Sequence, residues 1–157
     1  MNSKKKHYIL FFLLLVFLFI SCSSIQGPLF KSITNVPENQ SVIYIYRSND
    51  KTNSEFAISC NDKELGMLEN NQYLPELVNE GKVVIKSMVQ FKMFTTGLLD
   101  AAIADSTIYV FKAEPGKSYY IECKADEFSG QVLTIDLVPE NYGSNRIKNC
   151  VLVQQEN

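Results

Sequence analysis

The sequence predicts a mainly β protein: a small antiparallel β-sandwich or half-open barrel of seven or eight short strands with one short helix. From Ser41 onward, apolar residues recur with a period of two, which is the pattern of strands with one buried face. The same runs are rich in β-branched and aromatic residues. Turn signals containing Asn, Gly or Pro separate the runs about every ten residues, as in small all-β domains.

The first 21 residues have the order of a cleaved bacterial lipoprotein signal peptide. Three lysines, at 4–6, precede an apolar run from Ile9 to Ile20, and Ser21 stands directly before Cys22. Twelve apolar residues rise only about 18 Å as a helix, which is too short for a bilayer core of about 30 Å. We therefore expect cleavage between Ser21 and Cys22. The alternative is an ordinary secretory signal that ends near a cysteine.

Residues Phe19 to Cys22 resemble the lipobox of bacterial lipoproteins, with Phe19 at the position usually held by Leu. The resemblance implies transfer of a diacylglyceryl group to the Cys22 thiol, cleavage after Ser21 and further acylation by a fatty acid such as palmitate. Two or three acyl chains give stable membrane anchoring. The expected location is the bacterial cell envelope. If the source has two membranes the outer one is favoured, because Ser23 is not the Asp that resembles an inner-membrane retention signal.

The expected organisation is a signal peptide over residues 1–21, a lipidated tether over 22–40 and one β-sandwich domain over 41–157. The tether is predicted because Ser23 to Gln40 is weakly patterned and is interrupted by Gly27-Pro28. Cleavage leaves 136 residues with 12 basic and 17 acidic side chains, a net charge of −5. An acidic chain without a Lys or Arg run argues against a nucleic-acid partner.

The alternation and the turn signals define the elements in order. We expect strands over residues 41–47, 55–60, 63–68, 73–77, 82–88, 107–113, 118–123 and 132–138. Asn61-Asp62 suits a tight hairpin turn, and Pro115-Gly116 suits a type II turn. Pro75 restricts its strand to an edge or a bulge. Pro139 ends the last strand, and the tail around residues 147–153 fits either an edge strand or a helical turn.

The same alternation predicts which side chains of the strand at 118–123 face the core. Tyr119, Ile121 and Cys123 are expected to point inward. On the opposite face, Tyr120, Glu122 and Lys124 are expected to point outward.

The apolar insertion over residues 91–104 contains the one predicted helix, which begins near Thr96. Its apolar side chains predict either a lid folded over the sandwich or an exposed contact surface for a partner or the membrane. Two turns of helix need tertiary support, which favours the lid. The residues of the candidate contact surface are Phe94, Leu98, Leu99 and Ile103.

Three segments resemble a family of bacterial lipoproteins called domain of unknown function 2846. They are residues 41–47 (SVIYIYR), residues 58–68 (ISCNDKELGML) with the following Tyr73, and residues 114–121 (EPGKSYYI). The similarity covers about residues 38–124. Asn61-Asp62 replaces the usual Asp-Gly of the family, and the insertion at 91–104 is a further departure. The resemblance implies a β-sandwich in the cell envelope and no established activity.

The only histidine, His7, lies in the signal, and the chain has no tryptophan. The mature chain therefore lacks a Ser-His or Cys-His nucleophile pair and any histidine-ligated zinc site. We expect no catalytic residue, no metal and no cofactor. Of the cysteines that remain unmodified, Cys60 and Cys123 occupy inward positions, so they form either a buried disulfide or free buried thiols; Cys150 is the third.

The densest acidic group is Glu122, Asp126 and Glu127. Paired carboxylates are what a glycosidase requires, and clustered oxygen ligands are what Ca²⁺ requires. A solvated loop is the simpler interpretation. The seven mature tyrosines present similar alternatives: a sugar- or peptide-stacking face, or ordinary core and cross-strand positions.

Two classes of function follow. The favoured one is a non-enzymatic, lipid-anchored envelope module that binds an envelope protein or supports an assembly. The alternative is a small wall- or sugar-active enzyme that uses Asp and Glu, and it requires two carboxyl groups about 5–9 Å apart in a cleft.

Overall fold

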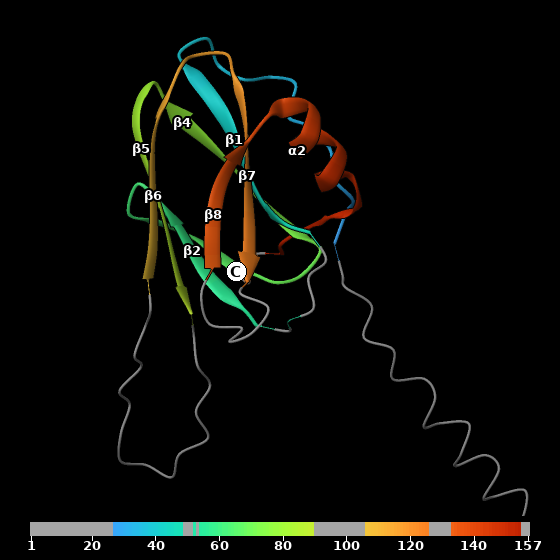
Figure 1. The fold of residues 1–157 in the computed structure, drawn as a ribbon. Helices are drawn as coiled ribbons and strands as arrows, with labels where there is room; N and C mark the ends of the chain where they lie inside the picture. Colours follow the sequence, from blue (N-terminus) through green and yellow to red (C-terminus); the bar gives the residue numbers. More distant parts are fainter. Residues whose placement is uncertain (1–26, 49–51, 53, 90–105, 126–132, 155–157) are drawn as a thin grey trace, which may run out of the picture.

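The computed structural model describes residues 27–48, 52, 54–89, 106–125 and 133–154, and the structural statements below concern these residues. Figure 1 shows the elements, with the helix on one side of the strands. Their bounds are β1 Gln40–Arg47, β2 Phe56–Cys60, β3 Lys63–Leu68, β4 Gln72–Asn79, β5 Gly81–Val89, β6 Ser106–Ala113, β7 Ser118–Ala125, β8 Leu133–Val138, α2 Glu140–Arg146, the 3₁₀ turn η1 Ile147–Asn149 and β9 Val151–Leu152.

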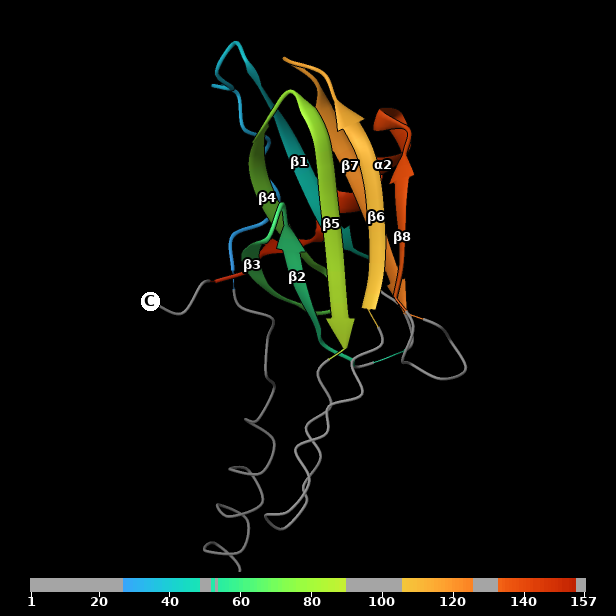
Figure 2. The same ribbon diagram turned by 90° about the vertical axis from the view of Figure 1, so that its left-hand side faces the viewer.

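The strands form two sheets, which confirms the predicted mainly β fold. The five-stranded sheet has the order β8-β7-β1-β4-β9, and the four-stranded sheet has the order β3-β2-β5-β6 (Figure 2). The five-stranded sheet is mixed, because β1 runs parallel to β7 and β4 runs parallel to β9. The predicted purely antiparallel pairing was wrong in these two places. Alternation shows which side chains face inward, but it does not show which strand lies next to which.

The predicted turns have the backbone that their sequences favour. Asn61 and Asp62 have φ values of 49° and 64° and join β2 to β3. Gly116 has φ 72°, as a type II turn requires, and its N–H donates to Gln40 O at 2.8 Å. Beyond Tyr73, β4 has no strand on its outer side in the described sheet. Pro75 therefore lies on an edge, as predicted.

The main core lies between the two sheets and is built from inward side chains of both. On β7, Ile121 and Cys123 are fully buried there, as predicted, and Tyr119 packs against the core with part of its side chain. The buried members are Ile43, Ile45, Phe56, Ile58, Cys60, Leu65, Leu68, Leu74, Val78, Val83, Ile85, Ala113, Ile121, Cys123, Ala125 and Ile135.

The outer face of the five-stranded sheet is also buried. The predicted orientation of the β7 side chains is confirmed, but that orientation does not expose Tyr120 and Glu122 to solvent. Tyr120 and Glu122 point away from the main core but are only 5% and 0% exposed. Tyr120 belongs to an apolar cluster with side chains of η1 and the N-terminal segment, and Glu122 pairs with Arg146 at the end of α2. Lys124 is exposed, as predicted. A second apolar layer results, made of Val42, Tyr44, Tyr46, Tyr73, Tyr120, Ile147 and Cys150.

The helix on this outer face is α2, which the sequence pattern did not predict. Pro139 ends β8 and its carbonyl accepts bonds from the N–H groups of Tyr142 and Gly143, at 3.0 and 2.9 Å. Gly143 lets α2 approach the sheet, because a Cβ at this position would lie 2.3 Å from Tyr120 Cβ. The ambiguous tail contains both predicted alternatives, the 3₁₀ turn η1 and the short strand β9. The helix predicted near Thr96 lies outside the described residues.

The segment predicted as a tether is partly folded onto the domain. Phe30 packs edge-on against the rings of Tyr44 and Tyr73, with centroids 5.1 and 5.3 Å away. The N–H of Ile33 donates to Tyr44 Oη at 2.7 Å. With Val36, these residues place apolar side chains at intervals of three on a sheet face that is itself apolar. The folded domain therefore includes the described residues before 41, back to Gly27, which the sequence pattern had assigned to the tether.

Two of the predicted sites lie outside the described residues: the cleavage and lipidation site at Ser21-Cys22, and the candidate contact surface at Phe94, Leu98, Leu99 and Ile103. Within the described part of the chain, no helix has the length and apolar character to cross a membrane.

Candidate functional site

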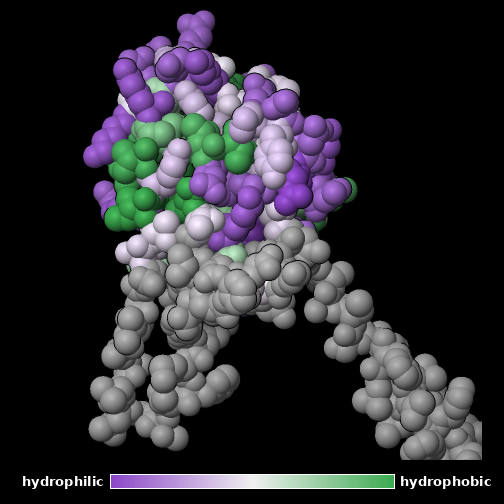
Figure 3. Space-filling view, viewed as in Figure 1, coloured by the Kyte–Doolittle hydropathy of each residue, from purple (hydrophilic) through white to green (hydrophobic). Residues whose placement is uncertain are grey.

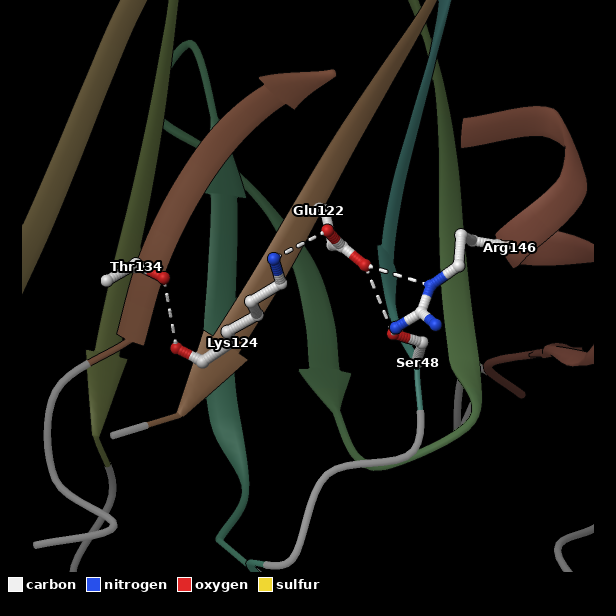
Figure 4. Close-up of polar contacts among 5 residues, drawn as sticks. All are labelled: Ser48, Glu122, Lys124, Thr134 and Arg146. Carbon is white, nitrogen blue, oxygen red and sulfur yellow. Dashed lines mark hydrogen bonds and ion pairs between the residues drawn. The ribbon is translucent and has the colours of Figure 1, made fainter. Parts of the chain in front are cut away.

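The outer face of the five-stranded sheet holds a buried carboxylate, Glu122 on β7, between two cations (Figure 4). Arg146 Nε at the end of α2 lies 3.4 Å from Glu122 Oε1, and Lys124 Nζ lies 2.9 Å from Oε2. Ser48, just after β1, donates to Oε1 at 3.2 Å and accepts from Arg146 Nη2 at 2.7 Å. The cluster therefore joins β1, β7 and α2.

Burial determines what this cluster can do. The Glu122 side chain is 0% exposed, whereas the side chains of Arg146 and Lys124 are 46% and 48% exposed. Each cation thus connects a buried carboxylate to solvent, and its charge offsets the cost of removing that carboxylate from water. The bond to Glu122 raises the pKa of Lys124, so this ammonium stays charged near neutral pH. The arrangement is that of an ion-pair network holding α2 on the sheet.

Tyr46 lies beside this network, and its hydroxyl is buried with no hydrogen-bond partner among the described residues. Burial raises the pKa of Tyr46 most, and the nearby Glu122 charge raises it further. The phenol therefore stays protonated at neutral pH and cannot act as a base there.

The predicted acidic group is only partly described, because Asp126 and Glu127 lie outside the described residues. The structure instead places Asp136 of β8 directly opposite Glu122 in the register of β7 and β8. Sequence reasoning missed this neighbour because the two residues meet only through strand pairing. Both Glu122 oxygens already face charged or hydroxyl partners, so Glu122 would have to be uncovered before it could meet a substrate.

All three described cysteines are free and buried. Cys60 and Cys123 therefore form no disulfide and are the free buried thiols that the sequence offered as the alternative. Both pack in the main core as small apolar side chains. Burial raises the pKa of Cys60 and of Cys150 to about 11, and that of Cys123 further. These thiols are protonated at neutral pH, which is unfavourable for nucleophilic chemistry.

A second buried charge, Arg47 at the end of β1, was not singled out from the sequence. It is 0% exposed and its guanidinium bonds the Ser54 carbonyl as well as the carbonyl and hydroxyl of Thr52. The same group lies 4.9 Å above the Phe56 ring. Arg47 therefore holds Thr52 and Ser54, which lie between β1 and β2 in the chain, against the end of β1. The sequence did contain a signal for this buried charge, because Arg47 stands at the end of a strand that is otherwise largely apolar.

An apolar groove lies between β3, β4 and the C-terminal segment. Its volume is about 510 Å³, and it is open to solvent on one side. Leu65 and Leu74 are almost fully buried and also belong to the main core. The lining residues are Leu65, Leu74, Pro75, Leu152, Val153 and Gln154.

At the opposite edge, apolar side chains are exposed on β5 and β6, and Figure 3 shows them on the side where β6 lies. Ile108, Val110 and Met88 are 58%, 50% and 45% exposed. The tyrosines do not form a comparable surface: Tyr44, Tyr46, Tyr73 and Tyr120 are buried, and Tyr142 is 43% exposed. These four tyrosines therefore occupy core positions rather than a sugar- or peptide-stacking face.

Within the described residues, no group of three or more His, Cys, Asp and Glu side chains is placed to hold a metal ion. Comparisons with protein-family models, with curated proteins and with solved structures find no match to the chain. The resemblance to the lipoprotein family named above therefore stays an expectation that depends on the quoted segments.

Proposed function

We propose that the chain is a lipid-anchored lipoprotein of the bacterial cell envelope whose β-sandwich is a non-enzymatic binding or assembly module. The observation that carries the proposal is the run of twelve apolar residues after three lysines, followed by Ser21 and Cys22. Acylation of Cys22 would tie the domain to a membrane.

The folded N-terminal segment supports this proposal. Only Ser23 to Gln26 separate Cys22 from Gly27, and the chain is packed on the domain from there onward. Five Cα–Cα steps span at most about 18 Å. A lipid on Cys22 would therefore hold the sandwich close to the bilayer, with the β9 edge nearest to it.

The polar groups of the described core support a non-enzymatic role. Glu122 is enclosed by cations that bind it to the fold, the three thiols are buried with raised pKa values, and Arg47 is bonded to backbone carbonyls. The ion pairs of Glu122 join β7 to α2, Arg47 bonds residues that follow β1, and the thiols pack as small apolar side chains. Such structural roles are what a non-enzymatic domain requires of its buried polar groups.

Metabolic labelling tests the anchor. The full chain is expressed in a bacterium with an alkyne analogue of palmitate. We expect a labelled protein of mature size for the parent, and an unlabelled, uncleaved precursor for Cys22→Ala. The matched control is Cys150→Ala, which removes a buried thiol and should label like the parent. Labelling that persists in Cys22→Ala would overturn the proposal.

A further inference from the structure

The groove between β3, β4 and the C-terminal segment lies where the N-terminal anchor segment joins the domain. Leu152 lines the groove, and its N–H donates to Pro28 O at 2.9 Å. A Cβ added to Gly27 would lie 2.4 Å from Leu152 O. Gly27 and Pro28, the first described residues after Cys22, therefore lie directly beside the groove wall.

Chain length places Cys22 within reach of this groove. Its Cα can be no farther than about 18 Å from that of Gly27, because only five Cα–Cα steps join them. We propose that the groove shelters one acyl chain of the lipid on Cys22 while the protein is outside a bilayer. This inference depends on the lipidation proposed above.

The chemistry of the groove suits a hydrocarbon chain. Five of its six lining residues are apolar and none carries a charge, so an occupant needs no ionic partner. A volume of about 510 Å³ lies within the range of roughly 300–1,000 Å³ that is usual for small-molecule sites. This is room for one chain rather than for a complete lipid with two or three. Since the groove is open on one side, a bilayer buries acyl chains more completely, which restricts occupancy to the time outside the membrane.

Other occupants fit the groove less well. An added peptide strand would need free backbone groups along β4, but Pro75 has no N–H to offer there. The outer side of β9 is already used, because Leu29 bridges Val151 and Pro28 bonds Leu152. The last three residues of the chain, Gln155 to Asn157, are polar and cannot provide an apolar filling.

The chain has no tryptophan, so a single introduced Trp can report on the groove. Gln154→Trp places it at the exposed rim, and Val110→Trp places it on β6 at the opposite edge as the matched control. Both changes are made in the mature chain, residues 22–157, produced without the signal so that Cys22 is unmodified. The probe is 9,10-dibromostearate, whose bromine atoms quench Trp fluorescence on contact.

We expect saturable quenching of Trp at position 154 that is at least five times that at position 110. Cys22 is then alkylated with N-hexadecylmaleimide, which attaches one long chain, or with N-ethylmaleimide, which makes the same linkage without it. Because the other three thiols are buried, Cys22 should react first, and mass measurement verifies one adduct. The hexadecyl adduct should lose at least three quarters of the quenching, and the ethyl adduct should keep it.

Equal quenching at the two positions would overturn the groove as a hydrocarbon site. Quenching that the hexadecyl adduct does not reduce would overturn the Cys22 chain as its occupant. Neither outcome depends on lipidation in cells, which the labelling experiment measures separately.

Discussion

Glu122 illustrates, at the scale of single residues, why facing away from one core does not mean facing water. Alternation along β7 placed its side chain correctly on the outer face of the five-stranded sheet, but α2 covers that face. A carboxylate buried in this way is tolerated because Arg146 and Lys124 remain paired with it. The sequence contained each of these residues, but nothing in it showed that they would meet.

Arg146→Met tests this network. The change keeps an extended apolar side chain but leaves the buried Glu122 carboxylate with Lys124 as its remaining cation. We expect a loss of about 2–4 kcal/mol in the free energy of unfolding, measured by urea denaturation. The double variant Glu122→Gln, Arg146→Met removes the stranded charge and should recover part of the loss. A single variant that unfolds like the parent would show that Lys124 and Ser48 alone offset the burial of the Glu122 carboxylate.

The buried thiols predict a pH dependence. The pKa of Cys60 and of Cys150 is about 11 in the folded protein against 9.0 for an exposed thiol. As pH rises above 9 the unfolded chain loses these protons first, so the folded state is progressively disfavoured up to about pH 11. We expect the melting temperature to fall over this interval.

The triple variant Cys60→Ala, Cys123→Ala, Cys150→Ala provides the control for this pH dependence, because burial raises the pKa of Cys123 as well. It should move the onset of the fall to about pH 10, where the tyrosines with raised pKa values begin to contribute: Tyr44, Tyr46 and Tyr120. An onset near pH 9 in that variant would show that the thiols are not its cause.

At the scale of elements, the strands were predicted far better than the helix that covers the outer face of the five-stranded sheet. All eight expected strands exist within a few residues of their predicted bounds, because period-two alternation and the turns at Asn61-Asp62 and Pro115-Gly116 are local signals. The helix α2 was missed because its sequence, ENYGSNR, is polar and short and contains a glycine. Its position depends on Tyr120, 20 or more residues earlier, and such distant packing leaves no local pattern.

Gly143 in α2 gives an element-scale prediction whose sign is the reverse of the usual one. Gly→Ala inside an exposed helix stabilises by about 0.5–1 kcal/mol. Here the new Cβ would lie 2.3 Å from Tyr120 Cβ and 2.6 Å from Tyr120 Cγ. We therefore expect Gly143→Ala to destabilise the protein by about 1–3 kcal/mol, since α2 must shift off the sheet. Thermal unfolding measures the effect.

Ser144→Ala, one residue further along α2, is the matched control for Gly143→Ala and should stay within about 0.5 kcal/mol of the parent. If Gly143→Ala raised the melting temperature instead, α2 would have to lie farther from β7 than the structure places it.

At the scale of the whole molecule, the folded domain includes segments outside the predicted strands. The candidate disulfide, tether and surface-facing tyrosines were all judged from local sequence, and each depended on what a distant segment does. Phe30, Ile33 and Val36 look like isolated apolar residues in a polar linker until the Tyr44-Tyr120 face is known. The groove at β9 could not be predicted at all, since it exists only where β3 and β4 meet residues 152–154, which are distant in sequence.

Two adjacent residues of the N-terminal segment test whether it belongs to the folded domain. Phe30 is partly buried against Tyr44 and Tyr73, whereas Leu29 is 65% exposed. Truncating a fully buried Phe costs about 3–5 kcal/mol, so the partly buried Phe30 should cost about 2 kcal/mol in Phe30→Ala. Leu29→Ala should cost less than about 0.5 kcal/mol. Urea denaturation of the mature chain, followed by tyrosine fluorescence, measures both. If residues 27–36 were an unfolded tether, both variants would unfold like the parent, and the proposed lipid on Cys22 would not hold the β9 edge close to a membrane.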